Sequence, residues 1–559
     1  MAAGCAHRRV HPVARAAVRT AALAALWFGA LPASARGQSP SDGSPLAPVE
    51  AAYQFARYWD DQLRLVQSLG RDSTPEGQPL ALVRDSLQTY GARFRQLLAK
   101  QPATSLSPDD LRALATLQAA ATEGLGAPDP SSPSPSSSPT VAPSLAALTA
   151  TLIARYGEAA NRVVLEGDTL NRLAVLGRLA HTDAVARRRQ LFLALEPVWR
   201  SVNGNNESWS PYRTLLRQRR AAWGDSASPI EAKGPAFGLT TAELERWLTD
   251  ALDRWRAATP DTPLEPWDWY YFTGAASRRL SPRIPAIADI RRVNDAYYTA
   301  IGASPAQLRI RFDLGARRGK YPVAYTDFGS RNRWRDGRLV PGEPWVFTSY
   351  LGGGLDNLAE LLHESGHAIH IAAIHTRPAY ITWPDNDTFT EALADLPALE
   401  LYEPAWQTRF LGDSAPLRES LRAKYAGIVL DFAWALFEIR VHRTPDADPN
   451  RIWADITSRY LHIRPHPEWS WWAMRGQLID GPGYLVNYAL GAFLVADMRA
   501  RVGERWGNFA QADAQMYPHL AESIYRFGLE RHSRRVLEDF LGRAARPDAL
   551  LADLARMSR

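Results

Sequence analysis

The sequence of 559 residues contains only one cysteine, Cys5, and no apolar run long enough to cross a membrane. Cys5 lies in an N-terminal segment that we interpret as a cleaved leader, so we expect the mature chain to contain no thiol. This excludes disulfides, thiolate metal sites and a cysteine nucleophile. Because a membrane-spanning helix needs about 20 successive apolar residues, we also expect no stable membrane insertion after the leader is removed.

A strong excess of either charge is also missing. The 65 Lys and Arg residues and 59 Asp and Glu residues give the chain a formal net charge of +6. Residues 1–35 contain four arginines and no acid, so removal of this segment leaves a net charge of +2. This near-neutral balance gives no support for contact with a phosphate backbone, and we expect no nucleic-acid partner. The hydrophobic share of 46% and the charged share of 22% predict a globular chain rather than a disordered one.

Residues 1–35 have the pattern of a secretory signal peptide. Arginines near the start are followed by an apolar run from Thr20 to Leu31 and then by Ala33, Ser34 and Ala35, a small-residue cleavage pattern. The alternative is a disordered N-terminus with no targeting role. We predict a signal peptide and therefore a secreted or periplasmic protein, whose residues 36–559 form one helical domain.

Most of the chain has helical periodicity. Apolar residues recur every three or four positions from Val49 to about Gly124, and again from Leu145 to about residue 300, where Thr240 and Glu243 form a predicted capping box. A Pro/Ser-rich loop at 124–143, to which we assign no function, separates these stretches. The first part of the domain, to about residue 300, is therefore predicted to be helical throughout.

The period changes in the middle of the chain. Leu308–Leu314 alternates apolar and polar residues, and Tyr321–Phe328 and Trp345–Tyr350 have the composition of strands. Helical patterns then continue to the C-terminus. The sequence predicts a mainly α fold with one small β-sheet, which lies just before the residues that carry the chemistry in the part from about 301 to 559.

The first candidate active-site residues lie on a predicted helix that follows three glycines at 352–354. His363 and His367 are four residues apart, so both rings lie on one helical face and can bind one ion, while Glu364 can reach a water molecule on that ion. The alternative is a pair of ordinary core histidines. His370 and His375 fall off this face, and we expect them to be ordinary residues.

A catalytic zinc ion needs three protein ligands and one open position. Glu391 is the candidate for the third ligand because it lies 24 residues after His367, in the first turn of a new helix. The alternative is that Thr388 and Glu391 form a capping box. Asp395, one turn later, is predicted to accept a hydrogen bond from the other ring nitrogen of a ligand histidine. We therefore expect one Zn²⁺ per chain.

These motifs resemble known gluzincin metallopeptidases. His363-Glu364-x-x-His367 with Glu391-Ala392-x-x-Asp395 is similar to the zinc peptidases of the angiotensin-converting enzyme and thimet oligopeptidase families. The stretch Trp471–Arg475 resembles a segment of the first family, and Gly483-Tyr484 with Tyr488 resembles a segment of the second. The resemblance implies a helical two-lobed ellipsoid with a deep central channel, a zinc ion at its floor and the small sheet beside the zinc helix.

The same resemblance suggests roles for Tyr488 and then Tyr484 as catalytic hydrogen-bond donors to the oxyanion, since a neutral phenol can donate one hydrogen bond. Packing in the core is the alternative for both rings. A histidine that precedes the tyrosines in these families has no counterpart between Met474 and Gly483, and His462 and His466 are the nearest substitutes. Asn487 replaces an arginine, so we do not expect chloride dependence to carry over.

The predicted function is a secreted zinc peptidase that hydrolyses oligopeptides with Glu364 as the general base. Internal cleavage and release of C-terminal dipeptides both remain open. Candidate substrate-binding residues are Ala324 and Tyr325, on a predicted edge strand that could pair with an extended peptide, together with His466 and Arg475. A secreted peptide-binding protein on a degenerate peptidase scaffold is the alternative from a different functional class.

Overall fold

The computed structural model describes residues 43–102, 106–125, 144–224, 228–318, 320 and 323–558. The predicted signal peptide at 1–35 and most of the Pro/Ser-rich loop at 124–143 lie outside these residues. Within them, no helix combines the length and the apolar character needed to cross a bilayer.

The first three helices of the described residues form a core of their own. They are α2 (Ala47–Leu69), α3 (Leu80–Ala99) and α4 (Pro108–Thr122). Gly70 ends α2 in the left-handed conformation that glycine adopts without steric cost. Tyr53, Phe94 and Leu117 are buried between the three helices and contact Tyr380 from the second half of the chain. Ion pairs from Arg377 to Glu50 and from Arg331 to Asp61 attach α2 to the rest of the molecule.

Among the described residues, nine further α-helices precede the sheet. They are α5 (Leu145–Asn161), α6 (Arg172–His181), α7 (Val185–Leu193), α8 (Glu196–Asn203), α9 (Pro211–Trp223), α10 (Thr241–Ala258), α11 (Trp269–Thr273), α12 (Ala275–Leu280) and α13 (Ile287–Ala300). The predicted capping box at Thr240 and Glu243 opens α10.

The prediction that this first part is helical throughout was wrong at one point. Strands β1 (Val163–Leu165) and β2 (Asp168–Leu170) form an antiparallel hairpin between α5 and α6. The turn residues Glu166 and Gly167 both have positive φ, at 53° and 89°, as a two-residue hairpin turn requires. The β-branched residues Val163 and Val164 favour the strand on one side of that turn.

The predicted central sheet is present and has three strands in the order β3-β7-β4. Strand β3 (Arg311–Gly315) pairs parallel with β7 (Glu343–Tyr350), and β4 (Tyr325–Ser330) pairs antiparallel with the other side of β7. Strands β5 (Arg333–Arg335) and β6 (Arg338–Val340) form a separate hairpin, so the described part of the chain has three small sheets rather than one. The first strand starts later than predicted because Arg309 has a φ of 59° and lies in a turn.

Helices dominate again after the sheet. They are α14 (Leu355–Ala373), α15 (Asp387–Ala398), α16 (Pro404–Leu411), α17 (Leu417–Arg443), α18 (Pro449–Leu461), α19 (Gln477–Asp480), α20 (Tyr484–Trp506), α21 (Met516–Leu520), α22 (Ser533–Leu541) and α23 (Asp548–Ala555). The predicted fold class, mainly helical with a small sheet beside the helix that carries His363, is therefore confirmed.

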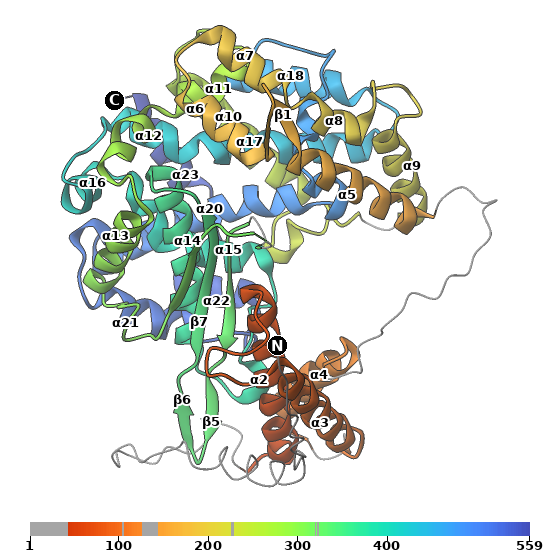
Figure 1. The fold of residues 1–559 in the computed structure, drawn as a ribbon, viewed down its shortest axis with the longest axis vertical. Coiled ribbons are helices and arrows are strands. Elements are labelled where there is room, and N and C mark those ends of the chain that lie inside the picture. The colour runs from red at the N-terminus through yellow and green to blue at the C-terminus, as the bar shows by residue number, and fades with distance from the viewer. Residues whose placement is uncertain are drawn as a thin grey trace, which may run out of the picture.

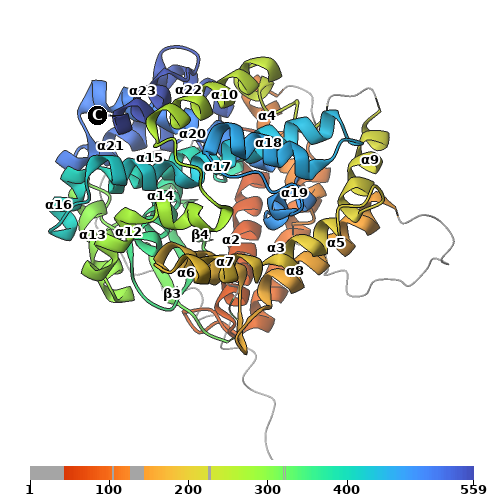
Figure 2. The same ribbon diagram turned by 90° about the horizontal axis from the view of Figure 1, so that it is seen from above.

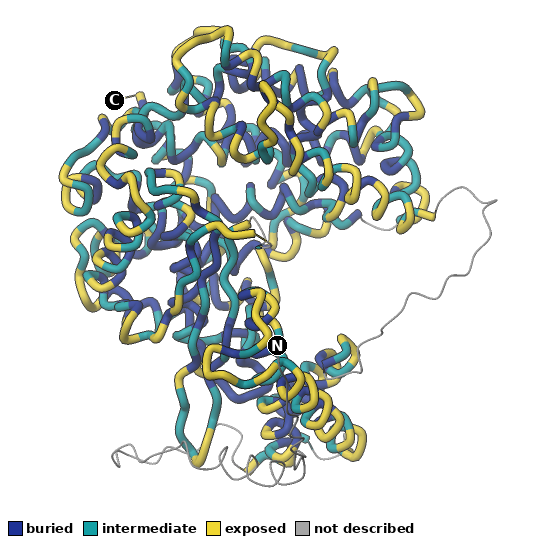
Figure 3. The backbone as a smooth tube through the Cα atoms, in the orientation of Figure 1, coloured by how far each residue is buried: buried dark blue, intermediate teal, exposed yellow. Residues whose placement is uncertain are grey.

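The elements form two groups joined through the centre of the molecule. Helices α5–α11 and α18 occupy the upper part of Figure 1, whereas α2–α4 and the strands β4–β7 extend through its lower part. Helices α14, α15 and α20 lie between the two groups, and the view from above shows α17 close to α20 and α15 (Figure 2). Helices α14 and α20 contain long buried stretches, whereas α3 buries only Val83, Leu87, Gly91 and Phe94 (Figure 3).

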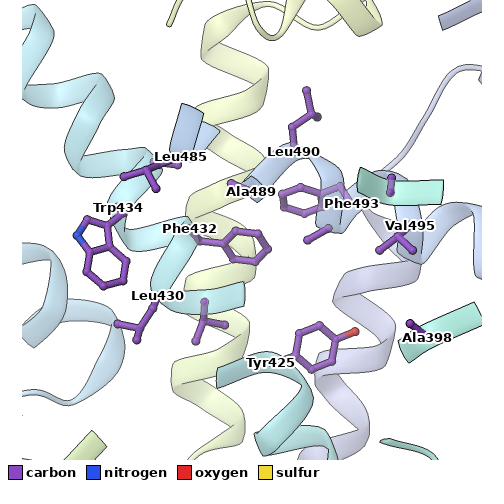
Figure 4. Packing of buried hydrophobic residues seen from close by; sticks show 14 of the residues in the cluster. Ala398, Tyr425, Leu430, Phe432, Trp434, Leu485, Ala489, Leu490, Phe493 and Val495 are labelled. Carbon is purple, nitrogen blue, oxygen red and sulfur yellow. The ribbon is translucent and has the colours of Figure 1, made fainter. Parts of the chain in front are cut away.

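The core is continuous around α17 and α20. Phe432 of α17 stacks on Phe493 of α20 with ring centroids 5.1 Å apart, and Leu485, Ala489 and other apolar side chains of α20 surround the pair (Figure 4). Burying one such aromatic or leucine side chain stabilises a fold by about 1.5–3 kcal/mol. This packing fixes α20 against α17.

Helices α14 and α15 approach each other at a glycine. A β-carbon added to Gly366 of α14 would lie 2.2 Å from the main-chain oxygen of Ala394 in α15. Such a distance is far below van der Waals contact, so only glycine permits this approach. Gly366 lies next to His367, and Ala394 lies next to Asp395, so the contact sets the spacing of the predicted site.

We therefore expect Gly366→Ala to lower the free energy of unfolding by about 1–3 kcal/mol, because the added methyl group must push the two helices apart. Gly177→Ala is the matched control, since Gly177 lies within α6 and a β-carbon there meets no atom within 4 Å. This control should be neutral or more stable by up to about 1 kcal/mol. Thermal and urea unfolding would test both, and equal stability of the two variants would contradict the close contact.

Candidate metal centre and active-site cavity

Helix α14 carries the two histidines and Glu364. Leu355, Leu358 and Leu362 are fully buried and hold one side of the helix against the core. The imidazole rings of His363 and His367 lie one turn apart, with centroids 4.8 Å apart and planes nearly perpendicular. Their side chains thus share one face of the helix, as the spacing predicts.

Helix α15 supplies the two carboxylates. Its N-cap is Asn386, whose side chain accepts a hydrogen bond from the main-chain N–H of Phe389 at 3.2 Å. Asn386 therefore performs the capping that Thr388 and Glu391 would otherwise provide. The Glu391 side chain instead reaches α14, where its Oε2 lies 3.3 Å from His363 Nε2 and 3.8 Å from His367 Nε2.

The donor set suits a zinc ion. One ligand atom from each of His363, His367 and Glu391 can be chosen so that all three lie within 4.8 Å of one another. Two imidazole nitrogens and one carboxylate oxygen form one of the ligand sets that catalytic zinc sites use, with a fourth position left for a water molecule. His363 Nδ1 donates a hydrogen bond to Asp395 Oδ1 at 2.7 Å, which leaves Nε2 free to bind the ion.

The pKa values of Glu391 and His363 also favour a cation at this site. Burial raises the pKa of Glu391, but hydrogen bonds from His363 and His367 outweigh it and lower that pKa well below its usual range. Burial lowers the pKa of His363, but Asp395 and Glu391 outweigh it and raise that pKa well above its usual range. Both directions show that the carboxylates stabilise positive charge here, which is what a divalent cation would supply.

Glu364 faces the same cavity from a buried position. The hydroxyl of Thr326, on strand β4, lies 2.7 Å from Glu364 Oε2 and 2.8 Å from the main-chain oxygen of Glu364. Thr326 therefore holds the carboxylate in one orientation. Because β4 is at the edge of the sheet, the adjacent Ala324 and Tyr325 line the cavity beside it.

The two tyrosines line the cavity from the first two turns of α20. Their rings make an edge contact, with centroids 5.2 Å apart for Tyr484 and Tyr488. Burial raises the pKa of both phenols, so both are neutral at physiological pH and keep a proton to donate. Both tyrosines of the sequence motif thus line the cavity that contains Glu364.

The other two candidate substrate-binding residues are placed differently. Arg475 donates to Asp431 Oδ1 at 2.7 Å, and its guanidinium carbon lies 5.6 Å from the ring centroid of Tyr488. His466 hydrogen-bonds to Glu265 at 2.8 Å and to Glu468 at 2.6 Å. Neither Arg475 nor His466 is among the described residues that line the cavity, whereas Asp431 is.

The cavity has a volume of about 680 Å³. Its walls come from β4, α14, α15, α17 and α20, so it lies where the two groups of elements meet. Trp383 and Asp431 are lining residues that the sequence did not lead us to expect, and the contact of Thr326 with Glu364 was not expected either, although Thr326 lies in the predicted edge strand. Only Asp431 had a usable signal, because it interrupts an otherwise apolar run at 428–437, whereas Thr326 and Trp383 reach the cavity through tertiary packing.

The two histidines that we expected to be ordinary are packed against aromatic rings. His370 is fully buried between Trp383 and Tyr525, and burial lowers its pKa to about 3. His375 packs against Trp334 with ring centroids 5.4 Å apart.

Solved structures with a similar fold are metallopeptidases. The chain aligns over 90% of its length with 99% of the M32 carboxypeptidase of Deinococcus radiodurans, with a TM-score of 0.52 and 15% identity. It aligns over 91% with 98% of metallocarboxypeptidase 1 of Trypanosoma cruzi, with a TM-score of 0.50 and 14% identity. A protein provisionally named oligoendopeptidase F matches over 91% of this chain and 84% of its own, with a TM-score of 0.52 and 15% identity.

No protein-family model and no curated protein sequence matches the chain. The structural similarities show that it has the helical fold of these carboxypeptidases and of the oligoendopeptidase. The more specific resemblance to the angiotensin-converting enzyme and thimet oligopeptidase families stays a prediction.

The contact between Asp395 and His363 generates a prediction about metal affinity. We expect Asp395→Asn to weaken zinc binding by about 10- to 100-fold, because the amide is a poorer acceptor for the Nδ1–H that orients the ring. Asp387→Asn is the control, since Asp387 lies on the same helix and lines the same cavity but is not in the ligand group. Competition with a chromogenic chelator would measure both affinities, and an unchanged affinity for Asp395→Asn would contradict this orienting role.

Proposed function

We propose that this chain is a secreted zinc-dependent peptidase that cleaves internal peptide bonds of oligopeptides. The observation that carries the proposal is the convergence of His363, His367 and Glu391 beside Glu364, in a cavity that Tyr484 and Tyr488 also line. Two of the solved structures with this fold are carboxypeptidases, which supports peptide hydrolysis. The leader at 1–35 supports secretion or export to the periplasm.

In this proposal Glu364 is the general base. A zinc ion held by the two histidines and Glu391 would supply an acidified water molecule and polarise the scissile carbonyl. Glu364 accepts the proton of the attacking water and then donates it to the leaving amine. The hydrogen bond from Thr326 keeps Glu364 Oε2 in place, so that the other oxygen can face the reacting water.

In this proposal the tyrosines stabilise the oxyanion that forms during the reaction. As the carbonyl oxygen gains negative charge, a neutral phenol can donate a hydrogen bond to it at a fixed position. Tyr488 is the first candidate for this donor and Tyr484 the second. Packing of each ring against the other limits the number of conformations that the hydroxyls can adopt.

Strand β4 offers main-chain groups to the substrate. It is an edge strand that begins at Tyr325, and both Tyr325 and the preceding Ala324 line the cavity. An extended peptide can pair with such an edge, which gives affinity without strong selection among side chains. The position of Thr326 against Glu364 places this edge next to the proposed base.

The charges of the cavity favour internal cleavage over removal of C-terminal residues. Its described lining includes the carboxylates Glu360 and Asp387 in addition to those near the histidines, but no lysine or arginine. Arg475, which could have bound a terminal carboxylate, is paired with Asp431 instead. A free C-terminal carboxylate would thus meet like charge without a cationic partner.

We expect Glu364→Gln to retain one zinc ion per chain but to lose about 100- to 10,000-fold in kcat, because the amide cannot accept the proton. Glu391→Ala, in contrast, should lose the metal together with the activity. Zinc analysis and a fluorogenic peptide assay with and without chelator would test both variants. Activity of Glu364→Gln near the wild-type level would overturn the assignment of the base, and a wild-type chain that binds no zinc would favour a non-catalytic binding protein.

A second test separates the two modes of cleavage. One peptide sequence is prepared with a free and with an amidated C-terminus. Both forms should be cut at the same internal bond and at similar rates, because no lysine or arginine of the described lining binds the terminal carboxylate. Mass spectrometry of the products would identify the bonds. Loss of cleavage on amidation would instead indicate a carboxypeptidase or a peptidyl-dipeptidase.

A further inference from the structure

Helix α17 holds both ends of the segment that leads into α20. At the first end, Asp431 Oδ1 accepts a hydrogen bond from Arg475 at 2.7 Å. At the other end, Glu438 Oε1 accepts a hydrogen bond from the main-chain N–H of Gly483 at 2.6 Å. Asp431 and Glu438 are seven residues apart, so they lie two turns from each other on one face of the helix.

The middle of the same segment is held from another direction. Arg219 of α9 donates from Nη1 to the main-chain oxygen of Leu478 at 2.9 Å and from Nη2 to that of Ile479. The segment from Arg475 to Gly483 is therefore fixed by three buried or half-buried side chains. Tyr484 follows it directly, and Tyr488 lies one turn further along α20.

Gly483 connects the fixed segment from Arg475 to Gly483 with the two tyrosines. It has a φ of 85° and is the N-cap of α20, where no side chain caps the helix. A β-carbon on Gly483 would lie 3.2 Å from the Cα of Ile230, a tight contact. The position of the first turn of α20 therefore depends on a main-chain N–H whose acceptor is the carboxylate of Glu438.

Glu438 has surroundings that a purely stabilising residue would not need. It is fully buried, and its second oxygen, Oε2, has no hydrogen-bond partner in the described part of the chain. Burial raises its pKa to about 7, against the opposing effects of the N–H groups of Gly483 and Leu485 and the charges of Arg219 and Lys233. Since an apolar side chain of similar size is often as stabilising as a buried charged group, its carboxyl points to a positioning role.

We propose that Glu438 is a positioning residue for peptide hydrolysis, which fixes the first turn of α20 through the N–H of Gly483 and thereby aims the hydroxyls of Tyr484 and Tyr488. This inference rests on the proposed function and goes beyond it, since Glu438 touches neither the metal ligands nor the cavity. It acts only through the tyrosines.

The first test uses two substitutions of this residue. Glu438→Met fills the space but removes the acceptor, and we expect kcat to fall about 10- to 100-fold, because a shift of about 1 Å in catalytic groups can cost that much. KM and zinc content should stay near the wild-type values. Glu438→Gln keeps an acceptor for the Gly483 N–H and should restore kcat to within a few-fold. Equal losses in both variants would overturn the proposal.

A double-mutant cycle shows whether the effect passes through the tyrosines. In a background with Tyr484→Phe and Tyr488→Phe, Glu438→Met should lower kcat by less than about threefold, because the hydroxyls that it misplaces are already absent. An undiminished loss in that background would overturn the proposal. If the variant with both Tyr484→Phe and Tyr488→Phe keeps the full wild-type kcat, the proposal is also overturned. Glu364 and the metal ligands would still account for hydrolysis in that case.

The matched control is Asp497→Met, another loss of a buried carboxylate. Asp497 lies on α20 and accepts a hydrogen bond from the main-chain N–H of Arg546 at 2.9 Å, but it is nine residues beyond Tyr488. We expect this variant to lose thermal stability and to keep its kcat at temperatures well below unfolding. A loss of kcat equal to that of Glu438→Met would show a general effect of destabilising α20 and contradict the proposal.

Hydrogen exchange gives a readout that needs neither activity nor metal. The amides of residues 483–488 should exchange faster in Glu438→Met than in the wild-type chain, and at wild-type rates in Glu438→Gln. If Glu438→Met does not fold, Glu438→Asp, which withdraws the carboxylate by one methylene, should show the same change to a smaller extent. Unchanged exchange in this segment would overturn the positioning role, whereas absence of peptidase activity with faster exchange would contradict only the proposed function.

Discussion

The close approach of α14 and α15 is the constraint on which the site depends. His363 and His367 lie on α14, and Glu391 and Asp395 lie on α15. These side chains can therefore meet only if the two helices pack closely beside them. Gly366 permits that approach, because a side chain there would overlap the main chain at Ala394. Glu391 and Asp395 flank Ala394, one on the first turn and one on the next. The same contact therefore brings Glu391 to the free nitrogens and Asp395 to the Nδ1 atom of His363.

The opposite wall is built on a different principle. Here α17 and α20 pack through stacked aromatic rings such as Phe432 and Phe493, which fix the distance between the helices but not the position of each along its axis. Polar contacts fix the position of α20 along its axis, since Glu438 accepts a hydrogen bond from the N–H of Gly483 and Asp431 accepts one from Arg475. Apolar burial thus provides most of the stability of this wall, and a few hydrogen bonds to α17 determine where the tyrosines lie.

The helical fold and much of the site could be predicted from the sequence because they depend on local periodicity. His363 and His367 share a face through their spacing alone, and Asp395 follows Glu391 by one turn. Residues that reach the cavity through tertiary register could not be predicted. Thr326 is an ordinary strand residue until β4 pairs with β7 and lies against α14. The hairpin at β1 and β2 was also missed, because its Glu-Gly turn lies between two strongly helical stretches.

The carboxylates of the cavity show why residue type alone does not assign a role. Asp395 receives the ring N–H of His363, and so its charge orients a ligand and is not free to take a proton. Glu364 receives only a neutral hydroxyl on one oxygen, which leaves the other oxygen available to a water molecule. Asp431 is paired with Arg475 and so contributes little free charge. Three acids in one cavity thus have different chemical environments because their hydrogen-bond partners differ, and those partners come from helices and strands that are distant in the sequence.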